Sequence, residues 1–194
     1  MSRILGAPVH QAYVYPDFDA ALTRFAGGGI GPFYIMQTGG MGRYRGEGHK
    51  LSVKVAFVYT GDTCIEIMSP NGEPDQQSAY DEFLRRNPEG GLHHIAYYSS
   101  DFDKTLAEMA AAGQPLSPVQ EFTDGTGNFL IEIYCEPVGV DNPILFQLIR
   151  PGLFDPWFDA MRDEAATWDG SDPYRDARPL MASAMAAAGA DAGA

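Results

Sequence analysis

The amino-acid sequence predicts an α+β protein in which two tandem βαβββ modules form a cleft-like open barrel, with a further helix at the C-terminal end. The first observation behind this prediction is an internal repeat. Residues 10–29 match residues 94–113 at nine of 20 positions, with an offset of 84 residues. The second observation is that each copy continues in the same order, from a β-rich run through a helix into three further β-rich runs. We therefore interpret the chain as a duplication of one unit.

The first module is expected over residues 5–70. It begins with the β-rich run Val9–Tyr15, which ends before Asp17, a residue type that caps helices. Apolar residues at helical spacing predict the helix that follows, and the glycines at 27–29 end it because glycine tolerates left-handed backbone geometry. Three strands are then expected, at 32–37, 51–59 and 63–68.

The second module is expected over residues 91–150 and repeats this order. Its first strand is His93–Tyr98, Asp101 caps its helix, and Gly113 ends that helix. The three strands that follow are expected at 116–122, 128–135 and 144–149.

Three further segments lie outside the modules. Residues 71–90 are a polar linker with a short helix expected around Tyr80–Arg86. Residues 151–180 form a helical extension, in which Leu153–Trp168 carries aromatic residues suited to docking on the barrel. The Ala/Gly-rich tail at 181–194 is expected to be disordered or frayed, because it offers little apolar surface to bury.

The composition is that of a soluble globular protein, with 45% hydrophobic residues and a formal net charge of −13. This charge argues against nucleic acid as a partner, since binding to a phosphate backbone requires clustered cations. No segment has the ~20 apolar residues needed to cross a bilayer, and Met1–Ala7 has no signal-peptide pattern, so we expect a cytoplasmic protein with no membrane partner. Cys64 and Cys135 are expected to be small buried thiols.

Four polar residues occur at equivalent places in the two copies. His10 and His94 lie in the first strand of each module, and Glu66 and Gln147 lie between apolar neighbours in the last strand. A carboxylate between two isoleucines is costly to bury without a partner. If the first and last strands line one cleft, two imidazoles, one carboxylate and one amide oxygen suit a divalent cation that keeps open coordination sites.

The chain resembles the vicinal oxygen chelate superfamily, which includes glyoxalase I, methylmalonyl-CoA epimerase, extradiol dioxygenases and bleomycin-resistance proteins. The resemblance spans about residues 5–150 and is closest in texture to the epimerase and glyoxalase-like branch. It is carried by the Pro-Asp-Phe-Asp run after His10, by Ile-Glu-Ile-Met-Ser-Pro at 65–70, and by Gly-Gly-Leu-His-His-Ile-Ala at 90–96. The last of these segments is the most specific.

The resemblance implies one metal ligand on the first and fourth strand of each module, which gives His10, Glu66, His94 and Gln147. His94 is preferred to His93 because the repeat aligns His94 with His10, and His93 should face the other side of the strand. It further implies one divalent ion per protomer, with Zn, Ni, Co, Mn and Fe all compatible with such ligands. Members of the family usually have Glu where this chain has Gln147, which argues against an extradiol dioxygenase.

The family chemistry implies removal of a proton next to a carbonyl, with the resulting enolate stabilised by the metal, as in an isomerase, epimerase or lyase. Such a reaction also needs a general base. The candidates are Glu132, whose strand should turn it toward the cleft, Glu47, in a Gly-rich loop at 39–49 that would act as a lid, and Glu66 itself.

The sequence leaves the substrate open. A CoA thioester fits the positive stretch that contains Arg43 and Arg45, whereas a hydrophobic ketone fits the many aromatic residues, of which Tyr59 and Tyr98 are expected at the cleft. Two other functions remain as alternatives: a ferrous-iron dioxygenase, and a metal-free protein that sequesters a small molecule. Family members often pair, so a homodimer is expected.

Overall fold

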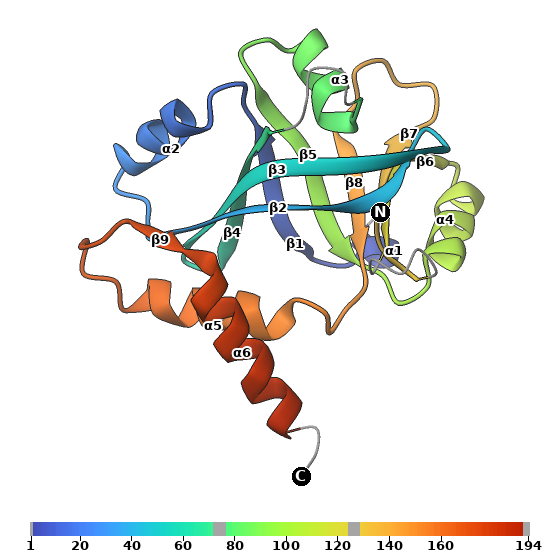
Figure 1. The fold of residues 1–194 in the computed structure, drawn as a ribbon. Helices are drawn as coiled ribbons and strands as arrows, with labels where there is room; N and C mark the ends of the chain where they lie inside the picture. Colours follow the sequence, from blue (N-terminus) through green and yellow to red (C-terminus); the bar gives the residue numbers. More distant parts are fainter. Residues whose placement is uncertain (1, 72–76, 124–128, 192–194) are drawn as a thin grey trace.

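The computed structural model describes residues 2–71, 77–123 and 129–191, and within them one sheet of nine strands and six helices. The strands follow the order β3-β4-β1-β5-β8-β7-β6-β2-β9. An additional pairing between β2 and β3 closes the first eight strands of this order into a ring, visible in Figure 1 as a strongly curved sheet.

Both modules have the predicted βαβββ order. The first consists of β1 (Pro8–Val14), α2 (Phe18–Ala26), β2 (Phe33–Tyr44), β3 (Glu47–Thr60) and β4 (Thr63–Pro70). The second consists of β5 (Gly91–Tyr98), α4 (Phe102–Ala111), β6 (Leu116–Thr123), β7 (Leu130–Pro137) and β8 (Leu145–Ile149). Outside them lie α1 (Ser2–Leu5), α3 (Ala79–Arg86), α5 (Asp155–Ala166), β9 (Tyr174–Asp176) and α6 (Ala177–Asp191).

The repeated helices begin as the sequence predicts. The Asp17 side chain accepts a hydrogen bond from Ala20 N at 2.9 Å, and the Asp101 side chain accepts one from Lys104 N at 3.0 Å. Each cap satisfies a backbone donor that the first helical turn leaves unpaired. Helices α2 and α4 then bury their apolar faces in separate clusters, against the first and the second module respectively. A third cluster contains inward-facing strand residues such as Val55 and Phe57 together with residues of α5.

The modules join through their first strands. β1 and β5 pair in antiparallel fashion, and each contains one extra residue relative to the other, Val9 in β1 and His93 in β5. Such β-bulges change the direction of a side chain relative to simple strand alternation. The expectation that His93 faces away from the interior is therefore wrong: it packs against Tyr80 and Tyr134 beside His94.

The Gly-rich stretch at 39–49 is part of a long hairpin, and the expectation of a lid loop is wrong. β2 and β3 pair continuously from Tyr34 and Phe57 to Tyr44 and Glu47. A Cβ atom at Gly39 would lie 2.0 Å from Leu51 O. The glycines thus allow β2 to approach its neighbouring strands closely, and the backbone pairing holds the segment in the sheet.

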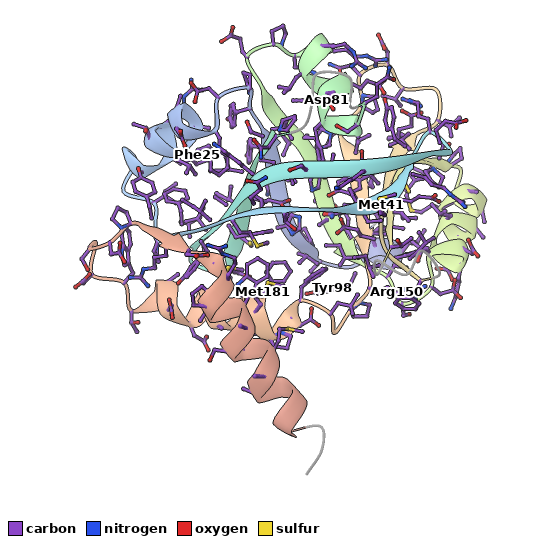
Figure 2. All side chains as sticks on the ribbon, in the orientation of Figure 1. Phe25, Met41, Asp81, Tyr98, Arg150 and Met181 are labelled. Carbon is purple, nitrogen blue, oxygen red and sulfur yellow. The ribbon has the colours of Figure 1, made fainter. Side chains whose placement is uncertain are left out.

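The C-terminal region is helical beyond the predicted extension. Helix α5 lies at one end of the ring, and α6 projects away from the body of the molecule (Figure 1). The expectation of a disordered tail is wrong for the described residues, since alanine favours helices and Leu180 and Met181 pack against the interior cluster; Met181 is labelled in Figure 2. The expectation for residues 192–194 lies outside the described residues.

Cys64 and Cys135 are both buried and free, as predicted. Over the described part of the chain, no helix combines the length and the apolar character needed to cross a membrane.

Candidate metal centre

The strand register brings the four predicted positions together around two alanines. Ala12 in β1 pairs with Glu66 on one side and with His94 on the other. Ala96 in β5 pairs with His10 on one side and with Gln147 on the other. Both alanines are fully buried. Because a methyl group fills little space, the longer side chains on either side meet above it.

The resulting cluster has ligand-like distances. His10 Nε2 lies 3.2 Å from Glu66 Oε2, and His94 Nε2 lies 3.3 Å from the same oxygen. One ligand atom from each of these three residues lies within 4.8 Å of the others. All three side chains are buried, with His94 completely inaccessible to solvent.

The polar atoms that face one another here have no ordinary partner. Among the described residues, His10 Nε2, Glu66 Oε2, His94 Nε2 and Gln147 Oε1 are buried without a hydrogen bond of good geometry. Buried polar atoms in native proteins are almost always satisfied, and a cluster of unsatisfied nitrogen and oxygen atoms is what a cation would satisfy. The residues present therefore fit a divalent ion.

Gln147 is oriented from its amide nitrogen. Its Nε2 donates to Glu132 Oε2 and to Tyr134 Oη, both at 2.9 Å, and Tyr80 Oη donates to Tyr134 Oη at 2.9 Å. Since the amide nitrogen is held on this side, Oε1 is the atom left for the His10, Glu66 and His94 group.

The two carboxylates of the site differ in proton affinity. Burial alone would raise the pKa of Glu66, but the neighbouring imidazoles, His10 before His94, lower it to about 2. Burial, followed by repulsion from Glu66, raises the pKa of Glu132 to about 8, against a lowering effect of the Gln147 hydrogen bond. Glu66 is thus suited to remain an anionic ligand, whereas Glu132 has the proton affinity of an acid–base group.

A cavity of about 170 Å³ adjoins the cluster. Its polar lining includes His10, Glu66, Glu132 and Gln147, and the rest is mainly aliphatic and aromatic. Phe154, Trp157 and Phe158 of α5 contribute to this lining, and the Phe158 ring lies 6.1 Å from the His10 ring.

The other predicted site residues lie elsewhere. Glu47 and Arg43 are exposed near the hairpin tip, and Arg45 pairs with Glu82 and Glu136 at 2.9 and 3.2 Å. Tyr98 donates to Asp155 of α5, and Tyr98 is labelled in Figure 2. Tyr59 is buried opposite Cys64 in the β3–β4 ladder. None of these five is among the residues that line the cavity described above.

Sequence reasoning missed several residues at the site. His93 contacts His94, Tyr80 donates to Tyr134, and Trp157 and Phe158 line the cavity. Tyr134, which accepts a hydrogen bond from Gln147, was not missed, because strand alternation predicts that it faces the cleft with Glu132. No pattern in the sequence indicated the bulge at His93 or the position at which α5 docks.

The chain belongs to the Glyoxalase/Bleomycin resistance protein/Dioxygenase superfamily, whose sequence profile matches residues 9–130. The ethylmalonyl-CoA/methylmalonyl-CoA epimerase of Cereibacter sphaeroides is 28% identical over 113 residues, which cover 57% of this chain and 73% of that protein. A variant of the Streptomyces coelicolor methylmalonyl-CoA epimerase, in complex with 2-nitronate-propionyl-CoA, superposes with a TM-score of 0.50 and 20% identity, covering 77% of this chain and 96% of that one. The Mycobacterium tuberculosis methylmalonyl-CoA epimerase superposes with a TM-score of 0.47 and is 18% identical. The superposition covers 77% of this chain and 90% of that one. At 20% identity, the likeness to the Streptomyces coelicolor structure establishes the fold alone.

Proposed function

We propose that this protein is a metal-dependent enzyme that removes a proton next to a carbonyl group of its substrate, as an isomerase, an epimerase or a lyase does. The observation that carries the proposal is the convergence of unsatisfied atoms from His10, Glu66, His94 and Gln147 beside a cavity that also contains Glu132. The same cavity thus provides a place for a cation and a separate group that can transfer a proton.

His10, Glu66, His94 and Gln147 would hold the ion. A bound divalent ion would supply Lewis-acid stabilisation of the oxygen charge that develops when the proton leaves the adjacent carbon. The ionised Glu66 partly neutralises the ion, and the amide of Gln147 contributes an oxygen without adding a second negative charge.

Glu132 is the proposed acid–base group. It lines the cavity, and its raised pKa allows it both to take up and to return a proton near neutral pH. The hydrogen bond from Gln147 Nε2 fixes the position of its carboxylate. Glu66 is less suited to this role because its pKa is about 2, which makes it a weak base. Glu47, exposed at the hairpin tip, is less suited because it does not line the cavity.

The substrate is proposed to present an apolar group around its carbonyl. The lining aromatic residues Phe57, Trp157 and Phe158 contact one another, with ring centroids 5.0 to 5.6 Å apart. Relatives named for methylmalonyl-CoA support a CoA thioester, in which the acyl group would enter the cavity and the CoA portion would remain outside. A hydrophobic ketone fits the same lining.

Proton exchange with solvent tests this function directly. We would load the protein with Zn²⁺, Co²⁺ or Mn²⁺ and incubate it in deuterium oxide with a panel of branched acyl-CoA thioesters and apolar ketones. Metal-dependent uptake of deuterium next to the carbonyl, detected by mass spectrometry, is the expected result. If no metal binds and no panel member exchanges, the proposal is wrong. Oxygen consumption with ferrous iron would instead identify a dioxygenase.

A further inference from the structure

His93 lies in an apolar enclosure directly behind a proposed ligand. The residue is 1% exposed, and its ring centroid lies 5.1 Å from that of Tyr80 and 5.1 Å from that of Phe83. It has two polar contacts among the described residues: Nδ1 is 2.8 Å from His94 Nδ1, and Nε2 is 3.4 Å from the carbonyl oxygen of Ala79.

The contact with Ala79 favours one of the two possible placements of the hydrogens. A carbonyl can only accept, so a hydrogen bond to Ala79 places the hydrogen of a neutral His93 ring on Nε2. Its Nδ1 is then an acceptor, and His94 Nδ1 must donate to it. A neutral His94 with its hydrogen on Nδ1 has a free lone pair on Nε2, the atom that lies 3.3 Å from Glu66 Oε2.

We infer that His93 is a positioning residue for the metal centre, in that it accepts a hydrogen bond from His94 and thereby keeps the Nε2 lone pair of His94 directed at the ion. This inference rests on the proposed metal-dependent function. In this arrangement a lone pair and a carboxylate oxygen face each other without a hydrogen between them. A cation bound between them would replace this repulsive contact with two favourable ones.

The linker helix α3 supports this arrangement. The peptide nitrogen of Ala79, at the start of α3, donates to Gln120 Oε1 at 2.9 Å, so the residue whose carbonyl contacts His93 is held from β6. Tyr80, the next residue, donates to the Tyr134 hydroxyl that in turn accepts from Gln147. The segment between the modules thus orients one proposed ligand through His93 and another through Tyr134.

Two substitutions separate hydrogen bonding from packing. His93→Asn keeps an acceptor close to the place of Nδ1, whereas His93→Phe fills the enclosure but has no acceptor. We would measure the Zn²⁺ dissociation constant by competition with a chromophoric chelator, and the visible absorption of the Co²⁺ form. We expect His93→Phe to weaken Zn²⁺ binding about 10–100-fold, the usual effect of losing an outer partner of a ligand histidine. His93→Asn should recover most of this loss and restore the Co²⁺ spectrum.

The outcomes are distinguishable from failure of the proposed function. If the wild-type protein binds no metal, the proposed function fails, and this inference fails with it. If the wild type and both variants bind metal equally, only the positioning role of His93 is wrong. The same conclusion holds if His93→Asn and His93→Phe weaken metal binding equally. ¹⁵N NMR of the Zn²⁺-loaded wild type gives a second check: a hydrogen on His94 Nδ1 and on His93 Nε2 is expected, and the opposite pattern would overturn the inference.

Discussion

The two modules place equivalent residues at the proposed metal centre but surround them differently. In the second module, Gln147 in β8 pairs with Tyr134, and Glu132 pairs with the next inward residue, Ile149. In the first module, Glu66 in β4 pairs with Phe57, and Val55 pairs with Met68. The register thus makes Phe57 the counterpart of Tyr134, and Val55 the counterpart of Glu132.

The same contrast occurs behind the histidines. The bulges in the two first strands are equivalent, and they contain Val9 beside His10 but His93 beside His94. Within the described residues, His10 Nδ1 has no hydrogen-bond partner, whereas His94 Nδ1 meets His93.

In the proposed metal centre, this difference gives the two modules different roles. The first module would supply the proposed ligand carboxylate, Glu66, whose charge is faced by His10 and His94 and would be compensated further by an ion. The second module has an uncharged ligand, Gln147, and has its carboxylate on the neighbouring strand at Glu132. We therefore propose that the carboxylate of the first module, Glu66, binds the ion and that the carboxylate of the second, Glu132, transfers the proton.

Loss of a ligand histidine should have the largest effect. We expect His94→Ala to remove Zn²⁺ binding, with a loss greater than the 10–100-fold typical for an outer partner, and to abolish proton exchange. His10→Ala should do the same. Gln11→Ala, on the opposite face of β1, serves as a matched control and should bind metal like the wild type, as measured by calorimetry. Full binding by both histidine variants would contradict the site.

Glu132→Gln should separate chemistry from metal binding. The amide keeps the size of the side chain but cannot accept a proton, so deuterium exchange should fall about 10²–10⁴-fold, the usual contribution of an acid–base group. Zn²⁺ affinity should change far less than in His94→Ala. The control is Glu121→Gln on β6, whose side chain does not line the cavity. Unchanged exchange in Glu132→Gln would assign proton transfer to another group.

Exchanging the two polar ligands tests the division between the modules. The double variant Glu66→Gln, Gln147→Glu keeps one ligand carboxylate and should still bind Zn²⁺. It also places a carboxylate at position 147 against Glu132, and it removes the amide nitrogen that donates a hydrogen bond to Glu132. We expect about 1–3 kcal/mol lower stability without metal, from denaturant unfolding, and slower exchange with metal. If the double variant exchanged deuterium at the wild-type rate, the placement of the two carboxylates would not be important.

The smallest effect is expected from the alanines between the ligands. Ala12→Val adds volume between Glu66 and His94, and overpacking of this kind costs about 1–3 kcal/mol. Zn²⁺ affinity should fall in parallel because the ligands are pushed apart. Ala21→Val, in the α2 cluster away from the site, controls for a general packing effect and should lower stability without changing affinity.

Sequence reasoning predicted the duplicated fold and the convergence of His10, Glu66, His94 and Gln147, because strand alternation and the repeat fix which positions share a face. It could not predict what depends on local departures from alternation. The bulge turns His93 inward, and pairing along Gly39–Tyr44 converts an expected lid into a strand. The covering of the cavity by Trp157 depends on tertiary docking of α5, which no local pattern encodes.

The most direct test of this account is the metal content of the wild-type protein. We would purify it without added metal, remove ions with a chelator, and titrate it with Zn²⁺ in a calorimeter while elemental analysis records the bound ion. The account predicts one ion per chain, bound in competition with the chelator and lost in His94→Ala. The proposed metal centre would be contradicted if none of the tested divalent ions bound, or if His94→Ala bound Zn²⁺ as well as the wild type does.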